Sequence, residues 1–113
     1  MVSVVTAIIK PHCLEAVVEA LKTTAVQGLT ASEVRGFGRQ GGHTETYRGT
    51  EYHVDLIPKV RVEVLVDSAE AETVADVIVE AARTGKIGDG KVWIQSIESV
   101  VRIRTGERDT DAL

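Results

Sequence analysis

Hydrophobic positions in the first third of the chain follow the spacing of a strand, then of a helix, then of a strand again. Residues 2–9 (VSVVTAII) form a short, β-branched run that stops at Lys10 and Pro11, and such a run is typical of a buried strand. Residues 12–24 repeat apolar side chains every three or four positions, which predicts an amphipathic helix that ends before Gly28. Residues 29–37 intersperse apolar with polar side chains, so we expect a second strand there.

The same order returns in the second half of the chain. Residues 59–67 alternate valines with charged side chains, which is the clearest strand pattern in the sequence. Residues 69–83 predict a second helix, and residues 91–97 and 99–104 predict two further short strands. The order of strand, helix, strand, long gap, strand, helix and strand is that of the ferredoxin-like arrangement.

The predicted fold class is therefore α+β, with a βαββαβ antiparallel sheet and two helices on one face. A long loop separates its second and third strands. The other face of such a sheet needs a cover, and we expect self-association to provide it.

Composition narrows the class of protein. A length of 113 residues predicts one domain, residues 1–113. The net charge of −4 argues against a nucleic-acid-binding protein, which would usually carry a basic face. The single Cys13 excludes an internal disulfide. The sequence shows no apolar run near the ~20 residues of a membrane span and no signal-peptide pattern at the N-terminus.

The segment Thr84–Lys91 (TGKIGDGK) is the strongest local signal of chemistry. It holds three glycines, one aspartate and two lysines. Glycines let a ligand approach the backbone, exposed N–H groups bind anions, and lysines add charge, so the segment is a candidate phosphate cradle. It lacks the Walker spacing. The alternative, of about equal weight, is a Gly-Asp-Gly turn with solvated lysines.

The gap Gly38–Pro58 is the second informative segment. Roughly twenty residues without a periodic pattern are uncommon inside a compact domain and are usually functional or disordered. Low hydrophobicity and many glycines predict that residues 38–57 form a mobile loop. Its Tyr47, Arg48 and Tyr52 are residue types that favour protein contacts. The alternative is an insertion whose tyrosines lie back on the domain.

Several segments together resemble one family. They are residues 36–40 (GFGRQ), 42–45 (GHTE), 47–49 (YRG), 51–52 (EY), 58–60 (PKV), 84–91 and 102–107 (RIRTGE). In this order and spacing they resemble the PII signal-transduction proteins of nitrogen regulation, along the whole chain. The resemblance implies a non-enzymatic, cytoplasmic homotrimer that senses ATP or ADP in clefts between subunits, and 2-oxoglutarate with Mg beside the nucleotide. The long loop, called the T-loop, would control ammonium transporters and enzymes of glutamine metabolism.

The resemblance also implies roles for particular residues. For nucleotide binding they are Thr30, Gly36, Gly38, Arg39, Gln40, Glu63, Gly88, Asp89, Gly90, Lys91, Arg102 and Arg104. For 2-oxoglutarate they are Gln40, Gly41, Gly42, Lys59 and Gly88, with Gln40 also touching Mg. Tyr52 matches a tyrosine to which modifying enzymes attach a nucleotide, and Tyr47, Arg48 and Tyr52 match partner contacts.

Elementary chemistry bears on three of these residues. In a strand over 99–104, Arg102 and Arg104 would share one face and converge on one ligand. Taken alone, they fit an exposed strand edge that resists aggregation better than a ligand site. Asp89 is expected to orient backbone N–H groups or a lysine.

The chain also departs from the family pattern at two positions. Gly41 stands where many members have lysine, which removes a charge near the 2-oxoglutarate site, and His12 stands where phenylalanine is common. Two other functions stay open. A weak ATPase is disfavoured because the chain shows neither a general-base motif nor a P-loop Ser/Thr. A PII-like sensor of another metabolite is disfavoured by the Gln40–Lys59 pair.

Overall fold

The computed structural model describes residues 1–38, 43–47, 50–54 and 56–113. The strands are β1 (Val2–Ile9), β2 (Thr30–Gly36), β3 (His43–Tyr47), β4 (Thr50–Val54), β5 (Ile57–Asp67) and β6 (Lys91–Ile97). The helices are α1 (Leu14–Leu21) and α2 (Ala71–Ala82), with short 3-10 turns η1 (Pro11–Cys13), η2 (Ser68–Glu70) and η3 (Asp109–Ala112).

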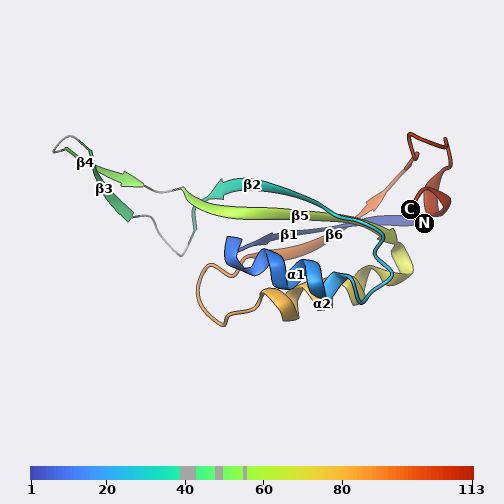
Figure 1. Ribbon diagram of the computed structural model, residues 1–113, viewed down its shortest axis with the longest axis horizontal. Helices are drawn as coiled ribbons and strands as arrows, with labels where there is room; N and C mark the ends of the chain where they lie inside the picture. Colours follow the sequence, from blue (N-terminus) through green and yellow to red (C-terminus); the bar gives the residue numbers. More distant parts are fainter. Residues whose placement is uncertain (39–42, 48–49, 55) are drawn as a thin grey trace.

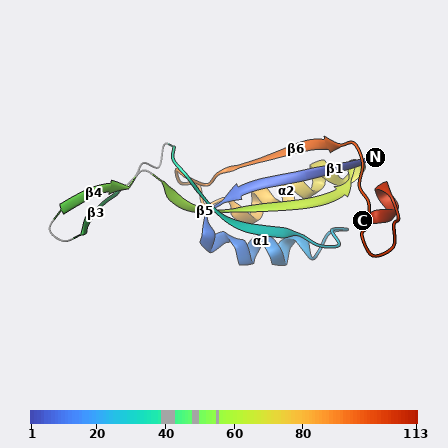
Figure 2. The same ribbon diagram turned by 90° about the horizontal axis from the view of Figure 1, so that it is seen from above.

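The main sheet has the order β2-β5-β1-β6, and every neighbouring pair in it is antiparallel. Figures 1 and 2 show α1 and α2 side by side on one face of this sheet, so the predicted ferredoxin-like class is confirmed. None of the helices in the described ranges is long and apolar enough to cross a membrane.

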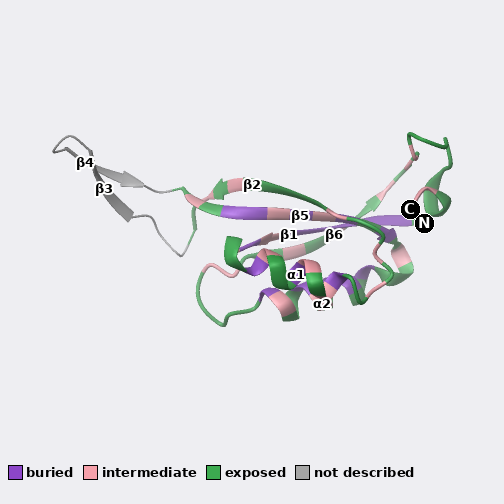
Figure 3. Ribbon diagram, viewed as in Figure 1, coloured by how far each residue is buried: buried purple, intermediate pink, exposed green. Residues whose placement is uncertain are grey.

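The core lies between the sheet and the two helices. Val5 and Ala7 of β1 pair with Val64 and Val62 of β5, so all four side chains point to the same face. They are buried against helix residues such as Ile78, whose side chain is also inaccessible. Figure 3 shows this burial concentrated along β1, β5 and the inner sides of the helices.

The other face of the sheet carries no helix. On β5 it presents charged residues between the core valines, and Leu65 there is 42% exposed. Trp93 of β6, which pairs with Thr6 of β1, is 37% exposed on the same face. The helix-free face of the main sheet therefore exposes two large apolar side chains to solvent or to another protein.

The long loop contains regular structure that the sequence pattern did not predict. Residues 43–47 and 50–54 pair as an antiparallel hairpin, with His43 opposite Val54 and Tyr47 opposite Thr50. The strands are rich in threonine and tyrosine, which favour β structure, and main-chain pairing requires no apolar periodicity. Figure 1 shows this hairpin beyond the ends of β2 and β5. The mobility of the loop stays a prediction.

One correction to the sequence analysis concerns residues 99–104, which do not form a strand. Only an isolated bridge joins Val101 to Arg108. Arg102 N–H donates to the Glu107 carbonyl at 2.9 Å and Gly106 N–H donates to the Arg102 carbonyl at 2.8 Å. Gly106 has φ 75°, a conformation that glycine adopts readily. The chain folds back on itself here, so the alternating sequence finds no neighbouring strand.

Candidate functional site

A cleft of about 810 Å³ opens where β2 ends, β5 begins and the glycine turn meets β6. Seven residues with predicted ligand roles line it: Gly36, Gly38, Lys59, Gly88, Asp89, Gly90 and Lys91. The other lining residues are Ile8, Phe37, Ile57, Lys86, Ile87 and Trp93. The structure therefore brings together two segments that are far apart in sequence, around a cavity with three lysines.

The glycine turn needs its glycines. Gly88 and Gly90 both have φ 94°, in the left-handed region that side-chain-bearing residues rarely adopt. A Cβ on Gly90 would lie 1.6 Å from the carbonyl oxygen of Ile8, which is far inside contact distance. The turn thus lies directly against β1, and Gly90 permits that approach.

The Asp89 carboxylate organises the start of the turn. Its Oδ2 accepts hydrogen bonds from the N–H groups of Thr84 and Gly85, each at 2.9 Å. Its Oδ1 accepts the Thr84 hydroxyl and lies 3.2 Å from Lys10 Nζ. The hydroxyl bond, with smaller contributions from the two amides and Lys10, lowers the pKa of Asp89 against a smaller opposing effect of burial. Asp89 therefore orients both N–H groups and a lysine, as the sequence suggested.

These bonds also decide which amides of the turn could meet an anion. The N–H groups of Thr84 and Gly85 are held by Asp89, and that of Lys86 donates to the Thr84 hydroxyl at 3.2 Å. Among the residues that the structure describes, the N–H groups of Ile87 and Gly88 enter no hydrogen bond. The candidate cradle is therefore shorter than the whole glycine segment.

Lys59 lies at the base of the cleft. It is only 9% exposed, and its Nζ donates to the Gly88 carbonyl at 2.6 Å. Burial is the main cause that lowers the pKa of Lys59, the charge of Lys10 lowers it further, and Asp89 opposes the shift. A partly desolvated ammonium of this kind gains much from an anionic ligand.

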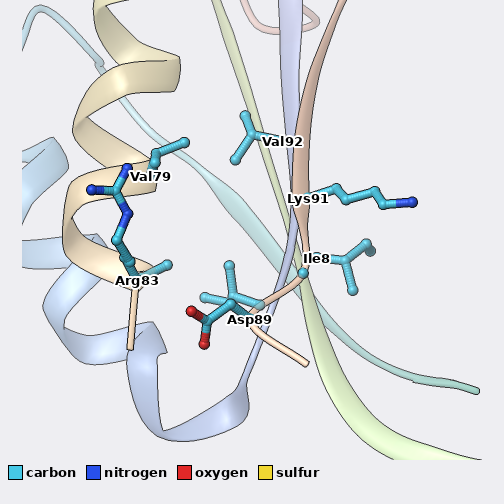
Figure 4. Close-up of a pocket in the computed structure, with 9 residues that line it drawn as sticks. Ile8, Val79, Arg83, Asp89, Lys91 and Val92 are labelled. Atoms are coloured by element: carbon cyan, nitrogen blue, oxygen red, sulfur yellow. The ribbon is translucent and has the colours of Figure 1, made fainter. Parts of the chain in front are cut away.

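The turn has two chemically different sides. A smaller hollow of about 220 Å³ lies between the C-terminal end of α2 and the start of β6. Figure 4 shows Asp89 and Arg83 on this side, while Lys91 and Ile8 point the other way. The acidic side chain of the turn thus faces α2, and Lys91 is directed toward the larger cleft.

Two predicted nucleotide-binding residues lie outside the cleft. Thr30 pairs with Glu63 across β2 and β5. Glu63 lies four residues along β5 from Lys59, which is about 13 Å at the rise of a strand, and its Oε1 is 2.8 Å from Arg61 Nε. These residues do not join the glycine turn within one chain.

Arg102 and Arg104 also lie elsewhere. Figure 1 places their segment at the end of the molecule opposite the β3–β4 hairpin. Arg102 Nη1 donates to Glu107 Oε1 at 2.9 Å and Nη2 donates to the Leu113 carbonyl at 2.6 Å, whereas Arg104 is exposed. The expectation that both share one strand face is wrong, because the chain turns at Thr105 and Gly106.

The remaining predicted site residues belong to the long loop. Arg39, Gln40, Gly41, Gly42 and Arg48 lie outside the described residues, so the predicted Mg contact of Gln40 does too. Tyr47 lies on β3, and Tyr52 lies on β4 opposite Glu45. Within the described ranges, no group of three or more His, Cys, Asp or Glu side chains could hold a metal ion.

Several residues without a predicted site role line the cleft or hold the glycine turn in the structure. Phe37, Lys86, Ile87 and Trp93 line the cavity, and Lys10 and Thr84 hold Asp89. Thr84 and Lys86 were visible inside the glycine segment. Lys10 carried no signal, because its contact with Thr84 spans 74 residues.

Comparisons with known proteins agree with this arrangement. The family model described as nitrogen regulatory protein P-II matches residues 2–107. A nitrogen regulatory protein P-II of Rhizobium meliloti is 55% identical over 107 residues, covering 95% of this chain and 96% of that protein. Nitrogen regulatory protein GlnK of Escherichia coli is 53% identical over 109 residues, covering 96% and 97%.

A solved structure shares the fold as well. The crystal structure of Arabidopsis thaliana PII bound to citrate superposes with a TM-score of 0.81 at 36% identity, covering 99% of this chain and 92% of that one. The match therefore extends over the sheet, both helices and the cleft. The chain belongs to the nitrogen regulatory protein P-II family and is a signal-transduction protein of nitrogen regulation.

Proposed function

We propose that this P-II protein senses an adenine nucleotide together with a small dicarboxylate, and that residues 38–57 carry the response to partner proteins. The observation that carries the proposal is the cleft in which the glycine turn meets Lys59, Lys86 and Lys91. The chain has a net charge of −4, so a site for a polyanion must gather cations locally. This cleft does so.

The nucleotide phosphates fit the glycine-turn side of the cleft. Lys91 is directed into it, and the N–H groups of Ile87 and Gly88 enter no hydrogen bond among the described residues. Backbone N–H groups and lysines together suit phosphate oxygens. ATP and ADP are the nucleotides that the family resemblance implies, with Gly36 and Gly38 near the base.

The dicarboxylate fits the Lys59 side. Lys59 is a buried cation at the base of the cleft, and its Nζ donates to the Gly88 carbonyl. The solved Arabidopsis thaliana PII is bound to citrate, so a small polycarboxylate is accepted by one family member. For this chain we propose 2-oxoglutarate, bound with Mg and ATP through Lys59, Gln40 and the glycines at 41 and 42.

A homotrimer would complete the site. The segment that carries Arg102 and Arg104 lies at the end of the molecule opposite the β3–β4 hairpin (Figure 1), so we propose that these arginines reach the nucleotide from another copy. The helix-free sheet face, with Trp93 and Leu65 partly exposed, offers apolar surface for that association. Thr30 and Glu63, which pair on β2 and β5, would then contribute from within the assembled cleft.

The β3–β4 hairpin is the proposed output. It stands beyond the main sheet, so it can meet a partner without disturbing the core (Figure 1). The proposed partners are an ammonium transporter and enzymes of nitrogen metabolism, with Tyr47, Arg48 and Tyr52 at the contact and Tyr52 as the site of nucleotide attachment. The protein acts by binding, without catalysis.

Calorimetric titration of the intact protein tests the proposal. ATP with Mg is added first, and 2-oxoglutarate is then titrated into the nucleotide-bound protein. We expect saturable binding of ATP, binding of 2-oxoglutarate only after Mg-ATP, and no release of phosphate above the rate of a heated sample. Absence of ATP binding would refute the sensor, binding of a different metabolite in place of 2-oxoglutarate would favour another PII-like sensor, and steady phosphate release would favour an ATPase.

A further inference from the structure

Lys10 lies at the foot of the glycine turn. It follows β1 directly, and its carbonyl accepts a hydrogen bond from Cys13 N–H at 3.0 Å, which fixes the corner where β1 leads into η1. Its side chain is only 12% exposed. The ammonium group therefore extends from a well-held corner of the sheet.

The contacts of Lys10 reach the whole first half of the turn. Its Nζ lies 3.2 Å from Asp89 Oδ1 and donates to Thr84 Oγ1 at 3.2 Å. Thr84 Oγ1 accepts the Lys86 N–H at 3.2 Å, and Asp89 Oδ2 accepts the N–H groups of Thr84 and Gly85 at 2.9 Å each. One lysine thus anchors a closed polar network that fixes the backbone between residues 84 and 89.

The turn has little else to hold it. Residues 84–87 are exposed, and Ile87, its one large apolar side chain, is 63% exposed. Beyond the network, the turn is held by the Lys59 bond to the Gly88 carbonyl and by the approach of Gly90 to the Ile8 carbonyl. Because the side chain of Ile87 is largely exposed, the shape of the turn depends strongly on these polar contacts with β1 and β5.

We propose that Lys10 is a positioning residue of the anion-binding cleft: through Asp89 and Thr84 it holds the glycine turn in the shape that presents Lys91 and the N–H groups of Ile87 and Gly88 to a phosphate. Lys10 is not among the residues that line the cleft. Figure 4 shows Asp89 on the α2 side of the turn and Lys91 directed the other way, so the effect of Lys10 is relayed by the turn. The inference rests on the proposed nucleotide binding.

A second effect of Lys10 must be separated from this one. Its positive charge acts on Lys59 and lowers the pKa of that residue, so it also contributes to the field inside the cleft. Removal of the lysine therefore changes both the shape of the turn and the local charge. A double-mutant cycle with Asp89 distinguishes the two effects.

The cycle uses ATP affinity, measured by calorimetry on the full chain with Mg. The variants are Lys10→Met, Asp89→Asn, the double variant and Lys10→Arg. The control is Lys22→Met, because Lys22 is exposed and pairs with Glu19 on the surface. We expect Lys10→Met to weaken ATP binding about tenfold or more, the loss typical of a charge-assisted hydrogen bond. Lys10→Arg should recover most of this loss, and Lys22→Met should lose nothing.

The double variant shows whether Lys10 acts through Asp89 or directly on the charge of the ligand. If Lys10 acts through Asp89, adding Lys10→Met to Asp89→Asn should weaken binding by no more than about twofold. A further tenfold loss in the double variant would mean that Lys10 acts on the ligand charge directly, and would overturn the proposal. So would an ATP affinity of Lys10→Met equal to that of the unaltered protein.

Amide hydrogen exchange without ligand tests the same inference independently of nucleotide binding. In Lys10→Met the amides of Thr84 and Gly85 should exchange faster, while the amide of Val64 in the core keeps its rate. Unchanged exchange in the turn would overturn the inference. If the unaltered protein failed to bind ATP, the proposed function would fail while the exchange result still decided the role of Lys10. If Lys10→Met does not fold, Thr84→Val replaces it, because this variant removes the hydroxyl that accepts the Lys10 hydrogen bond. The same loss of ATP affinity and the same faster exchange of the Gly85 amide are expected.

Discussion

The ammonium group of Lys59 donates a 2.6 Å hydrogen bond to the carbonyl oxygen of Gly88. This bond joins the base of β5 to the glycine turn, across 29 residues of sequence. A carboxylate that enters the cleft would bring a full negative charge to this ammonium group. Gly88 also supplies an N–H group to the candidate phosphate cradle. The Lys59–Gly88 bond therefore links the proposed dicarboxylate site to the proposed phosphate site.

Lys59→Met should abolish binding of 2-oxoglutarate while weakening ATP only modestly. The substitution keeps most of the apolar stem but removes the cation from a site where Lys59 is 9% exposed. A buried carboxylate without a cation is strongly disfavoured. Calorimetry in the presence of Mg-ATP measures the effect, with Lys22→Met as the matched surface control. Normal 2-oxoglutarate affinity in Lys59→Met would refute the pairing.

Gly90→Ala should destabilise the protein far more than Gly28→Ala. A Cβ at position 90 would lie 1.6 Å from the Ile8 carbonyl oxygen in a backbone with φ 94°, whereas a Cβ at position 28 meets nothing within 4 Å. Strain and overpacking of this kind cost roughly 2–4 kcal/mol. Denaturant unfolding at one fixed protein concentration measures the difference. Equal unfolding midpoints for the two variants would show that the turn can move away from β1.

The stabilising effect of Asp89 should depend on pH in the acid range. Because the folded protein lowers the pKa of Asp89 below its ordinary value of 3.8, the ionised carboxylate favours the folded state at pH values above that. The contribution is lost as the pH falls from there toward the lower pKa of the folded state. Asp89→Asn should therefore be less stable than the unaltered protein at pH 7, and the difference should shrink as the pH falls below 4. A difference independent of pH would contradict this assignment of charge.

The sequence predicted the main sheet well where a strand pattern had a clear boundary. The strands Val2–Ile9 and Lys91–Ile97 match their predicted limits, since Pro11 closes the first and the glycine turn opens the second. The strand predicted for residues 99–104 is absent, because an alternating pattern does not ensure that a neighbouring strand is available for pairing. The contact between Arg102 and Glu107 closes a turn there instead. The hairpin of residues 43–54 was missed because its pairing depends on main-chain bonds between polar strands.

The candidate site was predictable in part for a similar reason. The glycine turn could be named because it is a compact segment with a recognisable pattern, whereas Lys59 was named from the resemblance to the PII family. The contact between Lys10 and Asp89 could not be named, because it joins residues that only the fold of β1 against the turn brings together. The separation of Arg102 from the cleft could not be predicted either, because the sequence shows only that its segment and the glycine segment are both basic.

Arg104→Ala should weaken ATP binding by roughly one to two orders of magnitude, which is the range of a desolvated charge-assisted hydrogen bond. Arg104 is the better choice for substitution, because Arg102 also binds Glu107 and Leu113 and its loss would loosen the C-terminal segment. Lys91→Ala should be similarly impaired.

Subunits that carry Arg104→Ala can be unfolded and refolded together with subunits that carry Lys91→Ala. The mixture should recover some sites of full affinity, because certain interfaces would then combine an intact Lys91 with an intact Arg104 from another copy. No recovery in the mixture would argue that the arginines do not complete a neighbour's cleft.

Removal of residues 43–54 should abolish partner binding and leave nucleotide binding intact. The excised segment is the complete β3–β4 pair, so no strand loses its partner, and it belongs to a separate two-stranded sheet from the main one. The described core residues lie on β1, β5, the helices and η1, so we expect the unfolding midpoint and the ATP affinity to change little. Pull-down from native lysate compares the shortened protein with the unaltered one. Substitution of Arg48 and Tyr52 in the full-length chain is the finer test, because it keeps the backbone of the loop while removing the side chains proposed for contact and modification. If the shortened protein captured the same partners as the unaltered one, another surface would carry the signal. In the proposed trimer, neighbouring subunits cover the helix-free face of the main sheet. The outer faces of α1 and α2 would then be the remaining candidates.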